Sequence, residues 1–371
     1  MEELESLESL LRDEKSFDIN VLAGAFEKRS KLDKRFKLSL IIFTSTHSPI
    51  ELFNSWHSRD FAFDLRELNG FYIIKLNRIL KRSTNDSDTR TTAGSFGIFR
   101  FGESNIWIAF TSETPYFFKN GVIRFIESYK PDISRVYLSS EELRRLFEKV
   151  EDSVLGEVFV KKAVLYSNIK EGQISFKKAH FQELFNTAEN ECSYVDKVEY
   201  DIRQNDEQNY HGFISRSLIS YYYSGKITNF FDKILPILVD MSEKKLEVFE
   251  NKERKYEDVQ AKPINIKFPQ NVFKDKYDNI RLIKALEKVS FGAVAVFHKN
   301  PYLHLSFLDF IDGSNFDIFV TNQNKMTIIP NYKCSMYSLM RVTDQVFKNF
   351  KEGKIEVAEK RQYSFSDFIG D

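Results

Sequence analysis

The densest group of side chains that could do chemistry lies near the C-terminus, between His298 and Asp317. This stretch contains two histidines and three aspartates, side chains that can hold a divalent metal whose bound water attacks a phosphodiester. The residues that could take part are His304, Asp309, Asp312 and Asp317. One hypothesis for the chain is therefore a metal-dependent phosphodiesterase or nuclease.

The same stretch also has a purely structural interpretation. Side chains alternate between the two faces of a strand, so His304 and Asp309 would point to opposite faces and could share a metal only across a bulge. Asp312-Gly313 is a standard hairpin-turn pair. We favour the structural interpretation, and the sequence leaves open whether the chain is an enzyme.

A basic segment lies near the N-terminus and carries six basic residues against one acidic residue, Asp33. Such a segment could face the phosphates of a nucleic acid, which is the sequence-independent part of nucleic-acid binding. The alternative is a solvated hairpin turn between two strands, where lysines discourage pairing of strand edges. The residues assigned to the nucleic-acid hypothesis are Lys28, Arg29, Lys31, Lys34, Arg35 and Lys37.

The common catalytic and cofactor-binding motifs are absent from the sequence. It has no phosphate-binding Gly-rich loop, no dinucleotide fingerprint, no nucleophile elbow and no zincin helix. His211 and Arg216 stand near Tyr221-Tyr222-Tyr223, but this pattern favours a strand that packs its tyrosines. We therefore expect no cofactor and assign no metal ligand.

Composition limits the class of protein. The chain has 371 residues with 54 basic and 54 acidic side chains, a balance that argues against a surface that binds nucleic acid all over. It is 42% hydrophobic and has 36 phenylalanines, enough to build a largely aromatic core. Cys192 and Cys334 are its two cysteines, which is compatible with a reducing cytosol.

Periodicity in the N-terminal part suggests both strands and helices. From about residue 17 to 111 the pattern is mainly that of strands, with a loop over 83–94. Ser139-x-x-Glu142 is a capping box that predicts a helix from Ser140 to Val150. A long helix is predicted from Phe230 to about Tyr256, kinked at Pro236 or starting there. Its second half, 242–258, is rich in charge, and we expect it to face water.

The C-terminal part predicts consecutive strands joined by short turns, and hence antiparallel pairing. The fold class expected is α+β, with largely antiparallel sheets and packed helices in two domains. The first covers residues 1–260 and could itself divide near 152, and the second covers 261–371 after a linker at 257–263. The strands and helices predicted in this part are Ile264–Phe268, Asp278–Val289, Ala293–His298, Tyr302–Asp309, Asn315–Thr321, Met326–Ile329 and Met336–Phe350.

These observations favour a non-catalytic binding or scaffold protein. Its partners could be nucleic acid, through the local basic segment, or another protein or a second copy of the chain. A prokaryotic nucleic-acid-processing or antiviral defence assembly would suit such a component. The acidic start of the chain and the lack of a long apolar run predict a soluble, cytoplasmic protein without a membrane contact.

Overall fold

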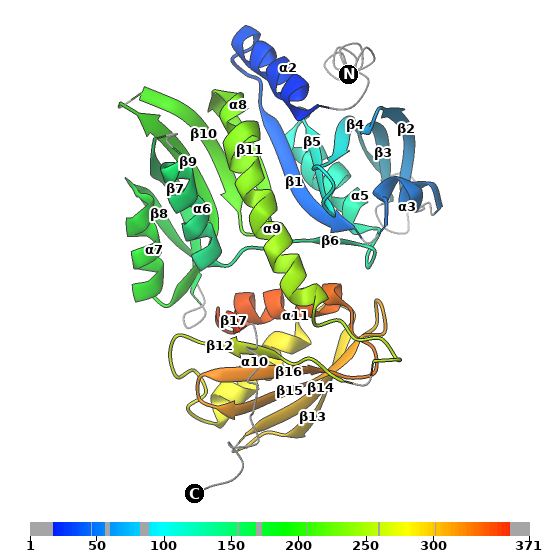
Figure 1. Ribbon diagram of the computed structural model, residues 1–371, viewed down its shortest axis with the longest axis vertical. Coiled ribbons are helices and arrows are strands. Elements are labelled where there is room, and N and C mark those ends of the chain that lie inside the picture. The colour runs from blue at the N-terminus through cyan, green and yellow to red at the C-terminus, as the bar shows by residue number, and fades with distance from the viewer. Residues whose placement is uncertain are drawn as a thin grey trace, which may run out of the picture. The chain divides into compact units, whose positions relative to one another are not determined.

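The computed structural model describes residues 18–45, 47–55, 60–81, 89–153, 156–167, 173–205, 207–258, 260–300 and 302–356. The chain divides into two units, Met1–Leu246 and Glu247–Asp371. Helices and antiparallel sheets occur in both units (Figure 1), which confirms the α+β class. The division between the units falls earlier than the boundary at 260/261 expected from the sequence.

The first unit is built on one antiparallel sheet, whose strands come from both sides of residue 152. They are β1 (Leu38–Ser45), β2 (Phe61–Leu68), β3 (Phe71–Lys81), β4 (Thr89–Arg100), β5 (Ile106–Thr111), β6 (Ile133–Arg135), β7 (Glu157–Ser167), β8 (Gln173–His180), β9 (Ser193–Gln204), β10 (Glu207–Ser215) and β11 (Ile219–Gly225). Their order is β2-β3-β4-β5-β1-β11-β10-β9-β7-β8, and β6 pairs with β1. The long-range pairing of β1 with β11 therefore joins the early and late strands into one sheet.

Helices of the first unit lie on the sheet in several short pieces. They are α2 (Ile19–Leu32), α3 (Pro49–Ser55), α4 (Pro115–Phe117), the π-helical turn η1 (Phe118–Ile123), α5 (Arg124–Glu127), α6 (Ser140–Asp152), α7 (Phe181–Asn190), α8 (Ile227–Asn229), the π-helical turn η2 (Phe230–Ile234) and α9 (Leu235–Glu250). Figure 1 shows α6 and α7 beside the late strands of the sheet. α8, η2 and α9 follow one another without a break, and Pro236 is the second residue of α9, so the helical conformation does not start at the proline.

Two expectations for the early part of the chain are wrong. Residues 19–32 form a helix rather than a strand, because Leu22, Ala23 and Phe26 share one buried face at helical spacing and Asp18 caps the first turn. Residues 89–94, the end of the expected loop, begin β4, which pairs with β3 from Thr89 to Phe99. Residues 83–88 lie outside the described residues.

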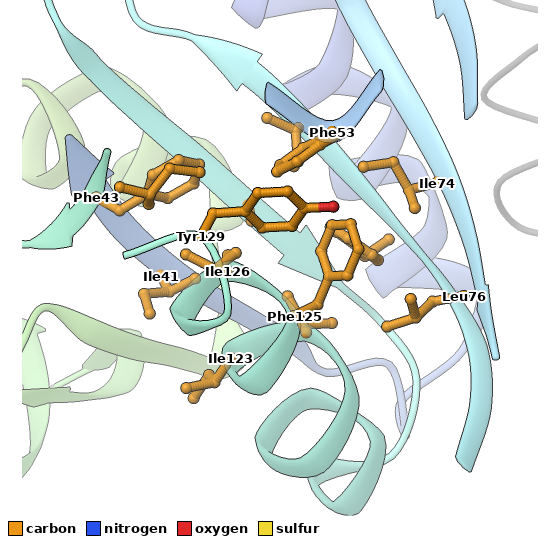
Figure 2. Close-up of a cluster of buried hydrophobic side chains, with 14 of the residues drawn as sticks. Ile41, Phe43, Phe53, Ile74, Leu76, Ile123, Phe125, Ile126 and Tyr129 are labelled. Carbon is orange, nitrogen blue, oxygen red and sulfur yellow. The ribbon is translucent and has the colours of Figure 1, made fainter. Parts of the chain in front are cut away.

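Phenylalanine fills the core of the first unit. The ring of Phe125 on α5 lies 4.9 Å from that of Phe53 and 5.3 Å from that of Tyr129, measured between centroids. Figure 2 shows these rings meeting between α5 and the strands, with Ile74 and Leu76 of β3 closing the cluster. Tilted and edge-on ring pairs of this kind each contribute about 0.5–1.5 kcal/mol beyond their burial, so the abundance of phenylalanine is explained by packing.

The charged half of α9 does not all face water, contrary to expectation. Ser242 and Lys245 are buried. The Lys245 ammonium reaches the carboxylate of Glu142 at 2.6 Å and lies 4.0 Å from the centroid of the Tyr137 ring. Glu142 belongs to the predicted capping box, which the structure confirms: Ser139 N donates to its Oε2 at 2.7 Å. A buried cation in α9 is therefore paired within the first unit.

Within its described residues, the second unit carries a six-stranded antiparallel sheet, two complete helices and the end of α9. The elements are β12 (Ile264–Lys267), α10 (Lys276–Glu287), β13 (Gly292–His298), β14 (Leu303–Asp309), β15 (Asn315–Asn322), β16 (Lys325–Pro330), α11 (Met336–Asn349) and β17 (Lys354–Glu356). The strand order is β13-β14-β15-β16-β12-β17. Along β14 to β16 buried side chains alternate mainly with partly exposed ones, and along β13 partly buried side chains alternate with exposed ones. One face of the sheet therefore packs in the core and the other is more open. Among the described residues, no helix has both the length and the apolar character needed to cross a bilayer.

Candidate nucleic-acid interface

The basic segment lies at the end of α2 and in the short connection to β1. Asp33 ends the helix: its N–H donates to Arg29 O at 2.9 Å, and its Oδ1 accepts the N–H of Arg35 at 2.9 Å. Phe36 is buried against the ring of Phe26, which anchors the connection. The one carboxylate within the segment is thus engaged with the backbone of its own turn.

All six basic side chains of the segment are exposed. Lys31 forms an ion pair of 3.3 Å with Glu27 of the preceding helical turn, whose other carboxylate oxygen accepts the N–H of Ile227. The segment is therefore a helix end and a loop rather than a turn between two strands. Lysine and arginine also suit the last turn of a helix, where the dipole is negative. The exposed residues are Lys28, Arg29, Lys31, Lys34, Arg35 and Lys37.

Lys37 joins this segment to an aromatic cluster on the sheet. Its Nζ lies 5.4 Å from the centroid of the Tyr223 ring, within the range of a cation–π contact. The contact arises because Leu38 pairs with Tyr222 across β1 and β11, which brings the residues on either side together. Burial, and then the nearby Glu199 and Tyr221, raise the pKa of Tyr223 to about 12, so its ring stays neutral.

Four rings from β10 and β11 form the cluster, which we call the aromatic row: His211, Phe213, Tyr221 and Tyr223. Tyr223 lies 4.9 Å from His211 and 6.3 Å from Tyr221, and Tyr221 lies 5.1 Å from Phe213. The four side chains share one face of the sheet and are partly exposed. Tyr222 between them points to the opposite face and is buried, as strand alternation requires.

His211 and Arg216 do not meet at a common site. His211 Nε2 lies 3.1 Å from Oε1 of Glu199 on the partly exposed face. Arg216 is buried beside the rings of Tyr194 and Tyr137, at 4.8 Å and 5.8 Å from their centroids. From the sequence, we interpreted this pattern as a strand that packs its tyrosines. In the structure the three tyrosines do lie on one strand, β11.

In the second unit, His304 and Asp317 come together on the open face of the sheet. His304 Nε2 lies 3.9 Å from Oδ2 of Asp317. The imidazole is stacked on the ring of Phe319 at 4.3 Å and lies 4.9 Å from the tilted ring of Phe297. This histidine is thus held by two neighbouring strands in an aromatic environment.

Asp309 lies on the other face, as alternation along β14 predicts, and is buried. Its carboxylate forms an ion pair with Arg341, accepts the hydroxyl of Ser338 at 2.7 Å and accepts the N–H of Ile311 at 2.9 Å. Burial lowers the pKa of Arg341 to about 10, so the guanidinium remains charged at neutral pH. These contacts tie the end of β14 to α11.

Asp312 serves the turn and the next helix. Its Oδ1 accepts the N–H of Ser314 at 2.8 Å, and its Oδ2 accepts the hydroxyl of Ser335. Ser335 is in turn the N-cap of α11, accepting the N–H of Ser338. The hydrogen bonds of Asp312 are therefore those of a turn residue.

The candidate metal-binding residues consequently do not converge. His304 and Asp317 lie on one face, whereas Asp309 and Asp312 lie with α11, and His298 stacks on Tyr302 at 4.3 Å. Within the described part of the chain, no three His, Cys, Asp or Glu side chains are grouped as metal ligands. A bulge does interrupt the pairing of β13 with β14, between Val296 and His298, but it does not bring Asp309 to His304.

The aromatic row was not identified from the sequence as part of a binding site. Its residues lie more than 170 positions from the basic segment, and only the pairing of β1 with β11 brings the two together. The alternation of Tyr221 and Tyr223 was the available signal, because it places both rings on one face. The sequence matches no protein-family model and no curated protein.

Proposed function

We propose that this protein is a non-catalytic nucleic-acid-binding component, which contacts phosphates through the basic segment 28–37 and bases through the adjoining aromatic row. The observation that carries the proposal is the contact of Lys37 with Tyr223, because it makes the cationic and aromatic surfaces continuous. Binding without sequence preference needs these two elements: a positive surface along the backbone and rings on which bases stack.

The distribution of charge supports this proposal although the net charge of the whole chain is zero. Attraction to phosphate depends on local charge, because exposed charges more than about 8–10 Å apart are screened at physiological salt. Six exposed cations within ten residues, set against Asp33 in the segment and Glu27 paired with Lys31, leave a local excess of about four positive charges. Each contacted phosphate releases counterions, so binding should weaken steeply with salt.

The aromatic row favours single strands over duplexes. Bases can stack on protein rings only where they are unpaired and accessible, and each stacked base contributes about 1–3 kcal/mol. Tyr223 and Tyr221 are both partly exposed, but Tyr221 also packs edge-on against Phe118 of the core, so a base can reach only the exposed part of its ring. His211 beside them adds a further flat ring. The preferred ligand is therefore single-stranded DNA or RNA.

The alternative proposed from the sequence, a metal-dependent phosphodiesterase, gains less support. It would need ligands from a set of residues that the fold distributes between two faces of a sheet, and Asp309 and Asp312 are engaged in structural hydrogen bonds. We therefore make binding without catalysis the proposal.

The test is titration of the full-length protein into a fluorescently labelled single strand, followed by anisotropy at increasing salt. A plot of log K against log salt should have a slope of about −4 if all six cations contact phosphates. Replacing the six residues by serine should abolish binding and leave the melting temperature almost unchanged. Absence of binding by the wild type at low salt would contradict the proposal.

A matched pair of triple variants separates the segment from total charge. Lys28, Lys31 and Lys34 replaced by serine remove three positive charges from the segment. Replacing Lys274, Lys276 and Lys284 by serine removes three positive charges elsewhere. All three side chains are exposed in the second unit. Only the first triple variant should reduce the slope, by about 2. Equal effects would mean that binding depends on total charge and not on this interface.

A further inference from the structure

The edge strand β13 differs from the other outer strands of the two sheets. It reads Gly-Ala-Val-Ala-Val-Phe-His from Gly292 to His298 and contains no acidic side chain, lysine, arginine or proline. The outer strands β2 and β17 both carry charged residues. Exposed edges are normally protected by charge or proline, because a bare edge pairs with other strands. β13 has neither charge nor proline, and its bulge lies only at its C-terminal end, between Val296 and His298.

Exposed rings surround this edge. The exposed fractions of Phe291, Phe297 and Phe310 are 73%, 65% and 62%. Phe291 also adopts a positive φ of 59°, a conformation that costs a bulky residue free energy. Large apolar side chains gathered in this way mark an interaction surface.

The direction of the backbone groups of β13 follows from one hydrogen bond. Phe310 N donates to Phe291 O at 2.8 Å, so the carbonyl of Phe291 points toward β14. Because backbone groups alternate along a strand, those of Gly292, Val294 and Val296 point away from β14. Within the described part of the chain β13 pairs only with β14, so these groups form an outward row of donors and acceptors for another strand.

We propose that β13 pairs antiparallel with β13 of a second copy of the chain, about a twofold axis at Ala295. In this register the outward groups of Val294 meet those of Val296 of the other copy. On the open face the large ring of Phe297 lies across from the small side chain of Ala293. Such size complementarity fits an isologous interface, in which each copy presents the same surface.

The exposed area is sufficient for such a dimer. A buried aromatic side chain removes about 150–250 Å² from water. Three rings that are each about two-thirds exposed would thus contribute on the order of 400 Å² per copy. Leu308, 40% exposed, lies on β14 opposite Ala293, and Tyr302, 49% exposed, lies just before β14. With the paired strands, the total approaches the roughly 1,200 Å² at which specific interfaces begin.

Charge favours a second copy over nucleic acid at this edge. β13 carries no lysine or arginine, so it offers nothing to hold a phosphate. It also carries no acidic side chain, so two copies bring no like charges together. Self-pairing would extend the six-stranded sheet across the axis.

The first experiment is disulfide cross-linking of full-length protein in a Cys192→Ser background, where the remaining Cys334 is buried. Ala295→Cys places two thiols across the axis at a non-hydrogen-bonded pair, a separation of about 4.5 Å between Cα atoms that a disulfide can span. Ala293→Cys is the matched control, because the register separates its two copies by four residues, or roughly 13 Å. We expect a covalent dimer from Ala295→Cys and little from Ala293→Cys. Equal cross-linking would overturn the register.

The second experiment measures self-association by sedimentation velocity over a range of concentrations. Ala295→Lys would place two like charges across the axis and should weaken dimerisation at least tenfold. Thr321→Lys adds the same charge at an exposed position of β15, an inner strand, and should leave it unchanged. A wild type that stays monomeric overturns the proposal. The proposal is also overturned if the wild type dimerises and Ala295→Lys leaves the dimerisation constant unchanged. It is overturned as well if that variant weakens single-strand binding and not self-association.

Discussion

Lys245 donates a hydrogen bond of 2.6 Å from its ammonium to Oε2 of Glu142, and this bond fixes α9 to the start of α6. The side chain of Lys245 is only 5% exposed and that of Glu142 is 26% exposed. The charge of a cation that is removed from water to this extent must be balanced by a partner, because an unpaired buried charge strongly destabilises the fold. The pair therefore stabilises the first unit by keeping a buried cation neutralised.

Replacing Glu142 by glutamine should destabilise the protein by about 3 kcal/mol, because Lys245 loses this carboxylate while remaining buried. The control is Glu141→Gln on the same helix. Its ion pair with Arg145 is exposed on both sides, so it should cost less than about 0.5 kcal/mol. Urea unfolding followed by circular dichroism measures both. Similar losses in the two variants would contradict this role for Lys245.

The same pair predicts how stability depends on pH. Burial alone would raise the pKa of Glu142, but Lys245 and the hydrogen bonds from Ser139 lower it below its ordinary value of 4.5. Because the folded-state pKa is the lower one, the stabilisation is complete above pH 4.5 and disappears as the pH falls through the folded-state value. The free-energy difference between wild type and Glu142→Gln should therefore shrink at successive pH values below 4.5. A constant difference would argue against this linkage.

The contacts of Asp309 and Asp312 predict stability effects. Asp309→Asn removes the charge that faces Arg341 and should cost about 3 kcal/mol. Asp312→Ala removes the acceptor for Ser314 N and for the N-cap residue Ser335, and should cost about 1–2 kcal/mol. Thermal melting with and without magnesium or manganese is the measurement. A folded Asp309→Asn that loses a metal-dependent cleavage of DNA or RNA would instead support the phosphodiesterase.

The patterns that could be interpreted from sequence are local. Strand alternation predicted the sheet of the second unit and the separation of His304 from Asp309, and the capping box predicted the start of α6. The helix α2 was missed, although Asp18 followed by Leu22, Ala23 and Phe26 is a helical signal. Its basic residues were interpreted first, because charge is conspicuous and does not distinguish a helix end from a turn.

What the sequence could not reveal depends on contacts between distant segments. The ion pair of Glu142 with Lys245 joins residues 103 positions apart, and charge in a helix is ordinarily exposed. Lys37 reaches Tyr223 only because β1 pairs with β11. No local pattern determines which strands become neighbours in a sheet of eleven.

The second unit should fold by itself when it is cut at its structural boundary. Glu253 accepts the N–H of Met336 at 2.8 Å at the start of α11, and Arg254 donates to Pro330 O at 3.0 Å. A fragment of residues 247–371 keeps both contacts, whereas one of residues 263–371 loses them. We expect cooperative unfolding of the longer fragment and about 1–2 kcal/mol less stability in the shorter. Non-cooperative unfolding of both would mean that the core is not confined to this unit.

Tyr223→Leu tests the aromatic half of the proposed interface separately from the basic half. Leucine keeps an apolar side chain on β11 but removes the ring on which a base would stack. Single-strand affinity should fall about tenfold, the equivalent of ~1.4 kcal/mol, whereas the salt dependence should not change because the cations remain. Tyr277→Leu, at an exposed tyrosine of the second unit, is the control and should bind like wild type. A duplex should bind both variants equally. If Tyr223→Leu instead lowered duplex and single-strand affinity alike, the ring would be supporting Lys37 rather than contacting bases.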